Sequence, residues 1–478
     1  MLKKKIIIPA LVVFLLADFA FSFLQYYHTP LCGDIEGGVL PKKGVLQILN
    51  DPFGFHAIAT GEKHINPNRF FSHWSLREYL QKVPGWLQYF VSPIDSVYLA
   101  SALLKLAVQI TFIFLLALFI TNKKNIFNKE FLLCAALVAP LFQVYGYWSR
   151  MGIVDKSIAN TFFYAVPLVF LMVFLLPFFR LIQGNGKLKA IHLFYLVPLT
   201  IALPLSGPLI PGVVLVVSTV VFMSYLFKSN PNAPVVFLLR LRANMKSMPA
   251  QIFYLIPISL WSFYALFLGR YDLNYLTETI PAPDRYLRLP YGLYRQVFHS
   301  LGVPLLLIMI GVNSYFIRKR FFSDEGKKIT HTLKWIGVFA AVYVLLLPLG
   351  GYRPYRPYTI RFDTIMPVTV ALIYIFGASS WFLFSEMRGK LLRKYRIAII
   401  LVLAIYTFAD TSGLSKNKGE RHALKILANS KDKIVRLPDD CTVMSWGKTY
   451  DYRKSVDKAE LLQFWGITKE KKLFYQQK

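Results

Sequence analysis

Apolar stretches long enough to cross a lipid bilayer recur along this whole chain. An α-helix needs about 20 mainly apolar residues to span the hydrocarbon core, and this length predicts about eleven transmembrane helices. A soluble domain of 478 residues would not bury so much apolar surface, because 55% of the residues are hydrophobic. The sequence therefore predicts an all-α polytopic membrane protein. The expected spans are residues 6–26, 96–120, 131–148, 157–179, 191–205, 209–227, 251–268, 301–316, 335–349, 365–384 and 397–410.

Lysine and arginine are concentrated in alternate loops between these spans, and this distribution predicts the orientation. Short loops rich in these residues stay in the cytoplasm during membrane insertion. We therefore expect a multi-pass plasma membrane protein, as in a bacterial inner membrane, with a cytoplasmic N-terminus and an extracytoplasmic C-terminus. The same loops account for the formal net charge of +30 without a nucleic-acid partner. They are residues 3–5, 123–129, 180–189, 228–246, 318–328 and 388–396.

Two of the predicted outer segments are long enough to have structure of their own. The first outer loop, residues 27–95, contains a stretch at 70–93 in which apolar and charged residues alternate at helical spacing. This pattern predicts amphipathic helices on the membrane surface, divided at Pro84. The tail, residues 411–478, follows a transmembrane domain of residues 1–410 and is long enough for a small extracytoplasmic α+β module.

Two local features are compatible with more than one structure. The Ser206-Gly207-Pro208 sequence separates two full spans or breaks a single re-entrant helix. Cys32 and Cys441 share one side of the membrane in the predicted topology, and whether they form a disulfide is left open.

Arginine largely replaces lysine in the predicted outer loops between residues 149 and 363. Its planar guanidinium binds phosphate or carboxylate through two hydrogen bonds and stacks on aromatic rings, which lysine does not do. Two interpretations follow: a site for an anionic, ring-bearing ligand such as a lipid-linked sugar phosphate, or an arginine–tyrosine belt against lipid headgroups. The candidate phosphate-binding residues are Arg150, Arg285, Arg288, Arg295, Arg353, Arg356 and Arg361.

Acidic residues are scarce on the predicted outer face, and three of them are candidate catalytic groups. Asp34 and Glu36 stand among glycines soon after the first span. A carboxylate there is suited to deprotonating an acceptor hydroxyl, and the two together are suited to holding a divalent cation. Asp155 lies just before the span at 157–179. The alternatives are an ordinary polar turn at Asp34 and Glu36, and at Asp155 an acid that stabilises the start of a helix.

Two further charged residues are predicted to lie inside the membrane. Asp18 and Lys105 fall at similar depths on the first two spans. A lone charge in the hydrocarbon core is costly, so such residues usually pair. We therefore expect a structural Asp18–Lys105 ion pair.

The second predicted outer loop carries a short motif. Ser149 and Arg150 are followed by four residues and Asp155, and then by an apolar helix containing Phe162 and Phe163. This arrangement resembles the corresponding loop of protein O-mannosyltransferases and aminoarabinose transferases. Both belong to the polytopic C-type glycosyltransferases, which use polyprenyl-phosphate-linked sugars and also have a long first outer loop with an early acidic residue.

The resemblance implies roles for the candidate acids. It makes Asp34 the catalytic base and Asp155 a supporting residue at the active site, whereas a phosphate-binding role for the arginines is inferred from their charge alone. The chain departs from the family pattern in two respects. Its acidic pair is Asp34-Ile35-Glu36 rather than two adjacent acids, and its tail is short.

These features predict a membrane glycosyltransferase. It would transfer a sugar from a polyprenyl-phosphate-linked donor to a hydroxyl of a polysaccharide, lipid or protein acceptor on the extracytoplasmic face. The alternatives are an envelope polysaccharide polymerase or ligase, a flippase, and a non-catalytic membrane assembly protein. A flippase is disfavoured because the third to tenth spans are nearly free of ionisable residues that would line a path.

Overall fold

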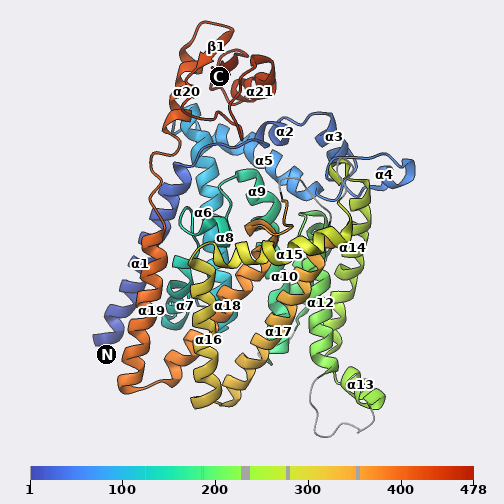
Figure 1. Cartoon of the computed structure of the whole chain (residues 1–478), viewed down its shortest axis with the longest axis vertical. Helices are drawn as coiled ribbons and strands as arrows, with labels where there is room; N and C mark the ends of the chain where they lie inside the picture. The colour runs from blue at the N-terminus through green and yellow to red at the C-terminus, as the bar shows by residue number, and fades with distance from the viewer. Residues whose placement is uncertain are drawn as a thin grey trace.

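Helices pack into a bundle that carries a small α+β module at one end, and the two chain termini lie at opposite ends (Figure 1). The computed structural model describes residues 2–123, 125–184, 186, 188–227, 237–275, 280–350 and 356–477. The long bundle helices are α1 (Leu2–Tyr27), α6 (Pro93–Thr121), α10 (Val166–Ile182), α12 (Ile210–Leu226), α14 (Leu255–Leu268), α16 (Gly302–Arg320), α17 (Asp324–Leu346), α18 (Phe362–Glu386) and α19 (Gly389–Ala409). The others are α7 (Lys129–Val138), α8 (Trp148–Met151), α9 (Ile158–Asn160), α11 (Ala190–Ala202), α13 (Phe237–Lys246) and α15 (Ala282–Phe298).

Seven helical segments of the described residues are long and apolar enough to cross a membrane. They are Ile7–Tyr27, Pro93–Thr121, Ile158–Ile182, Ala250–Tyr271, Gly302–Arg320, Asp324–Gly350 and Phe362–Glu386. Two apolar helices, Ala190–Leu205 and Ile210–Leu226, are shorter. The predicted all-α membrane fold is therefore confirmed, whereas the predicted count of eleven spans is not supported.

Local sequence explains where the count differs. The segment expected at 131–148 is helical only through Leu141, because α7 passes into a 3-10 turn at Pro140 and the next helix begins at Trp148. Helix α19 is 21 residues long, but its first turns are rich in lysine and arginine. Gly207 lies between two short helices, where a Cβ atom would stand 2.4 Å from the carbonyl oxygen of Phe163.

The predicted Asp18–Lys105 ion pair is wrong. The Lys105 ammonium is buried and donates a hydrogen bond to the main-chain carbonyl of Lys156. One carboxylate oxygen of Asp18 is buried without a hydrogen-bond partner in the described part of the chain. Similar depth on two adjacent helices did not bring the two charges together, because the long lysine side chain finds its acceptor in the loop before α9.

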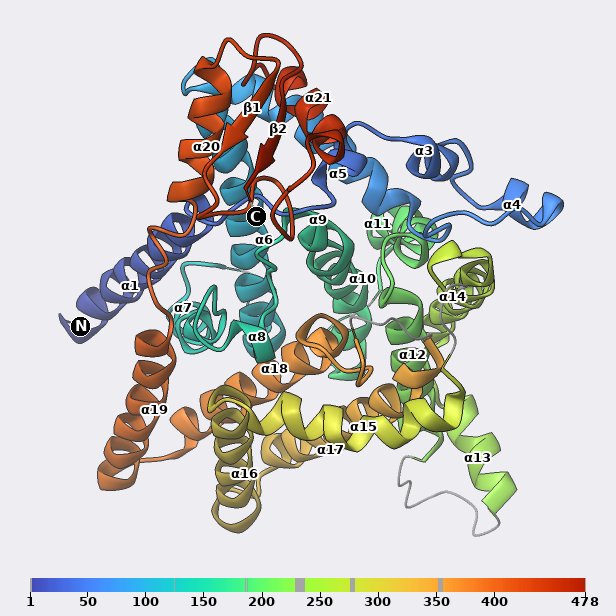
Figure 2. The same cartoon turned by 45° about the horizontal axis from the view of Figure 1, so that its top comes forward.

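The first loop and the tail form the structure above the bundle (Figure 2). The first loop contains α2 (Ile35–Val39), α3 (Lys43–Asn50), α4 (Phe55–Thr60) and the amphipathic α5 (Phe70–Leu87), which is continuous through Pro84 rather than divided there. The tail contains α20 (Lys418–Asn429), β1 (Ile434–Leu437), α21 (Val456–Phe464) and β2 (Leu473–Gln476). The strands are parallel, with Ile434 opposite Leu473 and Leu437 opposite Gln476.

The tail module shares one hydrophobic core with the first loop. Leu76 and Leu80 of α5 are buried in the same cluster as Leu424 and Phe474 of the module. The carboxylate of Glu420 strengthens this contact, because it accepts hydrogen bonds from the Leu31 amide at 2.7 Å, the Tyr98 hydroxyl at 2.7 Å and the Met444 amide at 2.9 Å. The tail is therefore part of the structure that positions the first loop, rather than an appendage to it.

Candidate functional site

A cavity of about 690 Å³ lies where five distant parts of the sequence meet. Its wall is formed by the first loop, the start of the α9–α10 helix, the 3-10 turn Leu273–Tyr275, the turn before α18 and the tail module. Its polar lining residues are Asp34, Asn66, Arg69, His73, Asn160, Tyr164, Asn274, Arg356, Arg361, Asp363 and Trp446.

Asp34 is the predicted catalytic acid that the structure places in this cavity. It is exposed and occupies the position before α2 in a left-handed conformation, with φ 71° and ψ 0°, and its side chain makes no capping hydrogen bond to that helix. The indole nitrogen of Trp446 donates a hydrogen bond to its Oδ2 at 3.2 Å. Gly33 permits this approach, since a Cβ atom there would lie 2.5 Å from Cδ1 of Trp446. The tail thus orients the acid of the first loop, a contact that no sequence pattern indicated.

Glu36, the second candidate acid, is not part of the cavity lining. Partial burial raises the pKa of its carboxyl, and the charge of Lys458 in the tail module opposes that rise. The predicted cation site at Asp34 and Glu36 gains no support from this arrangement. Within the described residues, no group of three or more His, Cys, Asp or Glu side chains is placed to hold a metal ion.

Arg356 and Arg361 line the cavity and share a carboxylate. The Nη2 atoms of Arg356 and Arg361 lie 2.7 Å and 3.2 Å from Oδ2 of Asp363, in the first turn of α18. Arg356 also donates to the hydroxyl of Tyr164 at 2.7 Å. Asp363 is only 1% exposed, so this buried acid fixes both guanidinium groups at the cavity wall. The sequence showed the arginines but gave no reason to single out Asp363.

The other predicted phosphate-binding arginines do not line the cavity. Arg150, Arg285 and Arg288 each donate to main-chain carbonyl oxygens, and Arg295 lies 5.4 Å over the ring of Tyr358. These contacts hold the four side chains against the protein itself and outside the cavity lining. Arg353 lies outside the described residues.

Two basic residues of the cavity were missed at the sequence level. Arg69 precedes α5 and His73 lies one turn into it, so both are on one helix face. Arg69 is 7% exposed and forms no ion pair within the described ranges. Burial, and then the charge of Arg69, lower the pKa of His73 to about 3. The available signal was the i, i+4 spacing of these two residues on the predicted amphipathic helix.

Asp155 does not line the cavity but holds Asn160, which does. It is buried and accepts hydrogen bonds from the Ser157 amide at 2.7 Å and from Nδ2 of Asn160 at 3.2 Å, and Asn160 lines the cavity. Burial raises its pKa to about 6, against the effect of the Ser157 hydrogen bond. The chain then forms a π-helical turn, η2 (Thr161–Ala165), a local structure that is frequent at functional sites. This turn contributes Tyr164 to the cavity wall.

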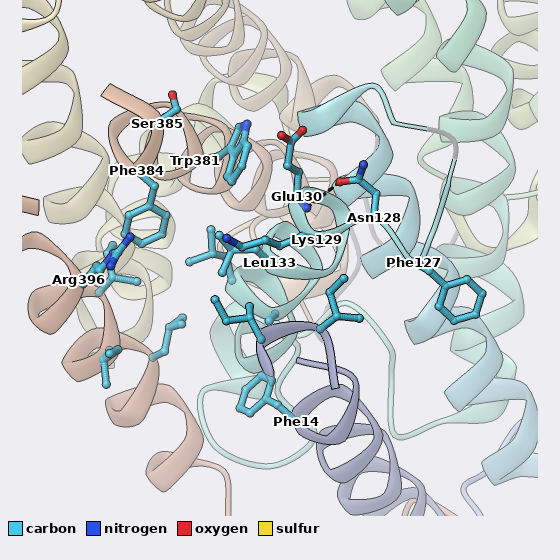
Figure 3. A pocket seen from close by; sticks show the side chains of 17 residues that line it. Phe14, Phe127, Asn128, Lys129, Glu130, Leu133, Trp381, Phe384, Ser385 and Arg396 are labelled. Carbon is cyan, nitrogen blue, oxygen red and sulfur yellow. Dashed lines mark hydrogen bonds between the residues drawn. The ribbon is translucent and has the colours of Figure 1, made fainter. Parts of the chain in front are cut away.

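A larger cavity, of about 860 Å³, lies toward the other end of the bundle between α1, α7, α18 and α19 (Figure 3). Apolar side chains such as Phe14 and Trp381 dominate its wall. Asn128 and Glu130, two of its polar groups, have structural partners. Asn128 caps α7 by accepting from the Glu130 amide at 2.8 Å, and Glu130 lies 3.7 Å from Lys123. An apolar crevice between bundle helices is typical of a lipid-contacting surface, so we place the candidate site in the other cavity.

Comparison of the chain with protein-family models, with curated proteins and with solved structures finds no match.

Proposed function

We propose that this chain is a membrane glycosyltransferase that transfers a sugar from a polyprenyl-phosphate-linked donor to an acceptor hydroxyl on the extracytoplasmic face. One observation carries the proposal. Asp34 from the first loop and Arg356 and Arg361 from the turn before α18 line the same cavity, although they are separated by more than half of the chain. A base and a set of anion-binding groups around one space is the arrangement that displacement of a phosphate requires.

The charge balance of the cavity supports an anionic ligand. Three guanidinium groups, those of Arg69, Arg356 and Arg361, face the acids Asp34 and Asp363 there. Asp363 is shared by two of the arginines, while Arg69 has no carboxylate within ion-pair distance among the described residues. A nearly buried cation without a counter-ion is costly, and a bound phosphate would supply one.

The proposed reaction is a single displacement. Asp34 takes the proton of the acceptor hydroxyl, whose oxygen attacks the anomeric carbon of the donor. A new glycosidic C–O bond forms as the bond between that carbon and the phosphate oxygen breaks. The electron pair leaves on the polyprenyl phosphate, where the arginines stabilise the increased negative charge. Trp446 orients the base through its hydrogen bond to Asp34.

Replacing the proposed base tests this function. The wild-type protein, purified in lipid nanodiscs, is supplied with hexosyl and pentosyl phosphopolyprenols, and release of phosphopolyprenol is measured with candidate acceptors. We expect Asp34→Asn to reduce release at least a hundredfold, since general-base catalysis contributes roughly 10²–10⁴-fold. Glu62→Gln, in an exposed acid of the same loop outside the cavity, is the matched control and should retain wild-type rates. Turnover by the Asp34→Asn protein equal to that of the control would remove Asp34 from this role.

A further inference from the structure

We propose that His73 binds hydroxyl groups of the transferred sugar and thereby selects a sugar-bearing donor over the bare polyprenyl phosphate. This inference rests on the proposed function and assigns a substrate-recognition role within the same cavity. The imidazole of His73 is 7% exposed and lines the cavity. Neither of its ring nitrogens has a hydrogen-bond partner within the described part of the chain.

The ring is held in place by packing rather than by hydrogen bonds. It meets the ring of Phe163 edge to face, with the centroids 4.8 Å apart and the planes at 78°. The adjacent Ser72 fixes the same turn of α5, because its hydroxyl donates to the Phe162 carbonyl at 2.9 Å. A buried donor and a buried acceptor without partners are costly, so a cavity that contains them is suited to a ligand that satisfies both.

The protonation state of His73 decides which ligand group fits. With a pKa lowered to about 3, the imidazole is neutral at physiological pH and presents one N–H donor and one acceptor nitrogen. A phosphate under these conditions mainly accepts hydrogen bonds, so it would leave the acceptor nitrogen unsatisfied. A hydroxyl group both donates and accepts, and a sugar carries several of them.

The polar groups of the cavity wall differ in what they offer a ligand. Arg356 and Arg361, next to α18, and Arg69, one turn from His73, offer donors only. Asn66 and Asn160 carry amides, which contain both donors and an acceptor, and they belong to the first loop and to α9. The guanidinium groups suit the phosphate, and His73 and the two amides suit the hydroxyl groups of a sugar next to it.

Binding measurements with matched donor analogues test this role. Dissociation constants are measured in nanodiscs for a phosphopolyprenol and for the same phosphopolyprenol bearing each of several hexoses and pentoses. We expect His73→Leu to weaken binding of the preferred sugar-bearing lipid by roughly three- to tenfold, the effect of one or two lost hydrogen bonds. Its affinity for the sugar-free lipid should stay within about twofold of wild type, and His73→Gln, which keeps a donor and an acceptor, should restore much of the preference. His56→Leu, at an exposed histidine of the same loop outside the cavity, is the matched control.

The outcomes separate this inference from the proposed function. Equal losses for both lipids, or no loss for either, in a His73→Leu protein with unchanged thermal stability would overturn the role of His73. If His73→Leu unfolds, a His73→Gln protein that loses the preference while remaining folded would also contradict it. A wild-type protein that binds no sugar-bearing lipid would overturn the proposed function itself, whatever the variants do.

Discussion

Two arginine-rich regions that look alike in the sequence have different surroundings in the structure. In the turn before α18, Arg356 and Arg361 surround a buried carboxylate and face a cavity. In α15, which runs across the bundle helices (Figure 2), Arg285 and Arg288 donate to the main-chain carbonyl oxygens of Pro348 and Pro357 and do not line that cavity. Arginine content alone therefore identifies surfaces that are able to bind anions. A binding site also requires a buried partner, here Asp363, that fixes the guanidinium groups around one cavity.

Removing one acid from each region should give the largest difference, and the difference is in the stability of the two variants. Asp363→Ala leaves Arg356 and Arg361 without their shared carboxylate, and loss of one partner of a buried ion pair costs about 3–5 kcal/mol of stability. Asp284→Ala removes an exposed acid from the first turn of α15 and should cost less than about 0.5 kcal/mol. Thermal unfolding in one detergent compares the two proteins. Equal stabilities would show that Asp363 does not fix the arginines as described.

Neutralising one arginine in each region tests whether only the arginines before α18 stabilise the leaving phosphate. We expect Arg361→Gln to slow release of phosphopolyprenol by roughly a hundredfold, because it removes a group that we propose stabilises the leaving phosphate. Arg285→Gln, whose side chain donates to the Pro348 carbonyl and does not line the cavity, should change the rate by less than about twofold. Similar losses from both substitutions would contradict the distinction and favour a ligand surface that extends over α15.

The smallest predicted effect is on the pH dependence of stability. It concerns Asp155, which is not a lining residue but accepts a hydrogen bond from the lining residue Asn160. Its native pKa is raised from 3.8 to about 6, so the native state binds this proton more tightly than the unfolded chain does. The stability that results is present at low pH and is lost as the pH rises from about 4 to about 6. Asp155→Asn should remove this part of the pH dependence, and its single carbonyl oxygen can accept only one of the two hydrogen bonds that Asp155 accepts from Ser157 and Asn160. A wild-type unfolding profile that is flat over this range would contradict the assignment.

The membrane fold was predictable because it depends on local properties of the chain. Length and hydropathy of each apolar stretch identified the seven membrane-length helices, although they overcounted spans where a proline or basic residues interrupt a helix. Asp34 was also accessible to sequence reasoning, as an acid among glycines directly after the first helix.

The rest of the site depends on contacts between distant segments. Trp446 reaches Asp34 across 412 positions of sequence, and Asp363 acquires its role only when Arg356 and Arg361 fold around it. No local periodicity encodes such contacts. The predicted Asp18–Lys105 pair failed for the same reason, because the partner of Lys105 is a carbonyl in a loop rather than a side chain on the neighbouring helix.

The position of a bound donor tests the proposed site most directly. Cryo-electron microscopy of the protein in nanodiscs with a phosphonate analogue of a glycosyl phosphopolyprenol, which resists cleavage, would locate the phosphorus and the sugar. We expect the phosphonate beside Arg356 and Arg361, with the anomeric carbon facing Asp34. Density for the headgroup along α15, or in the apolar crevice beside α7 and α19, would contradict this expectation.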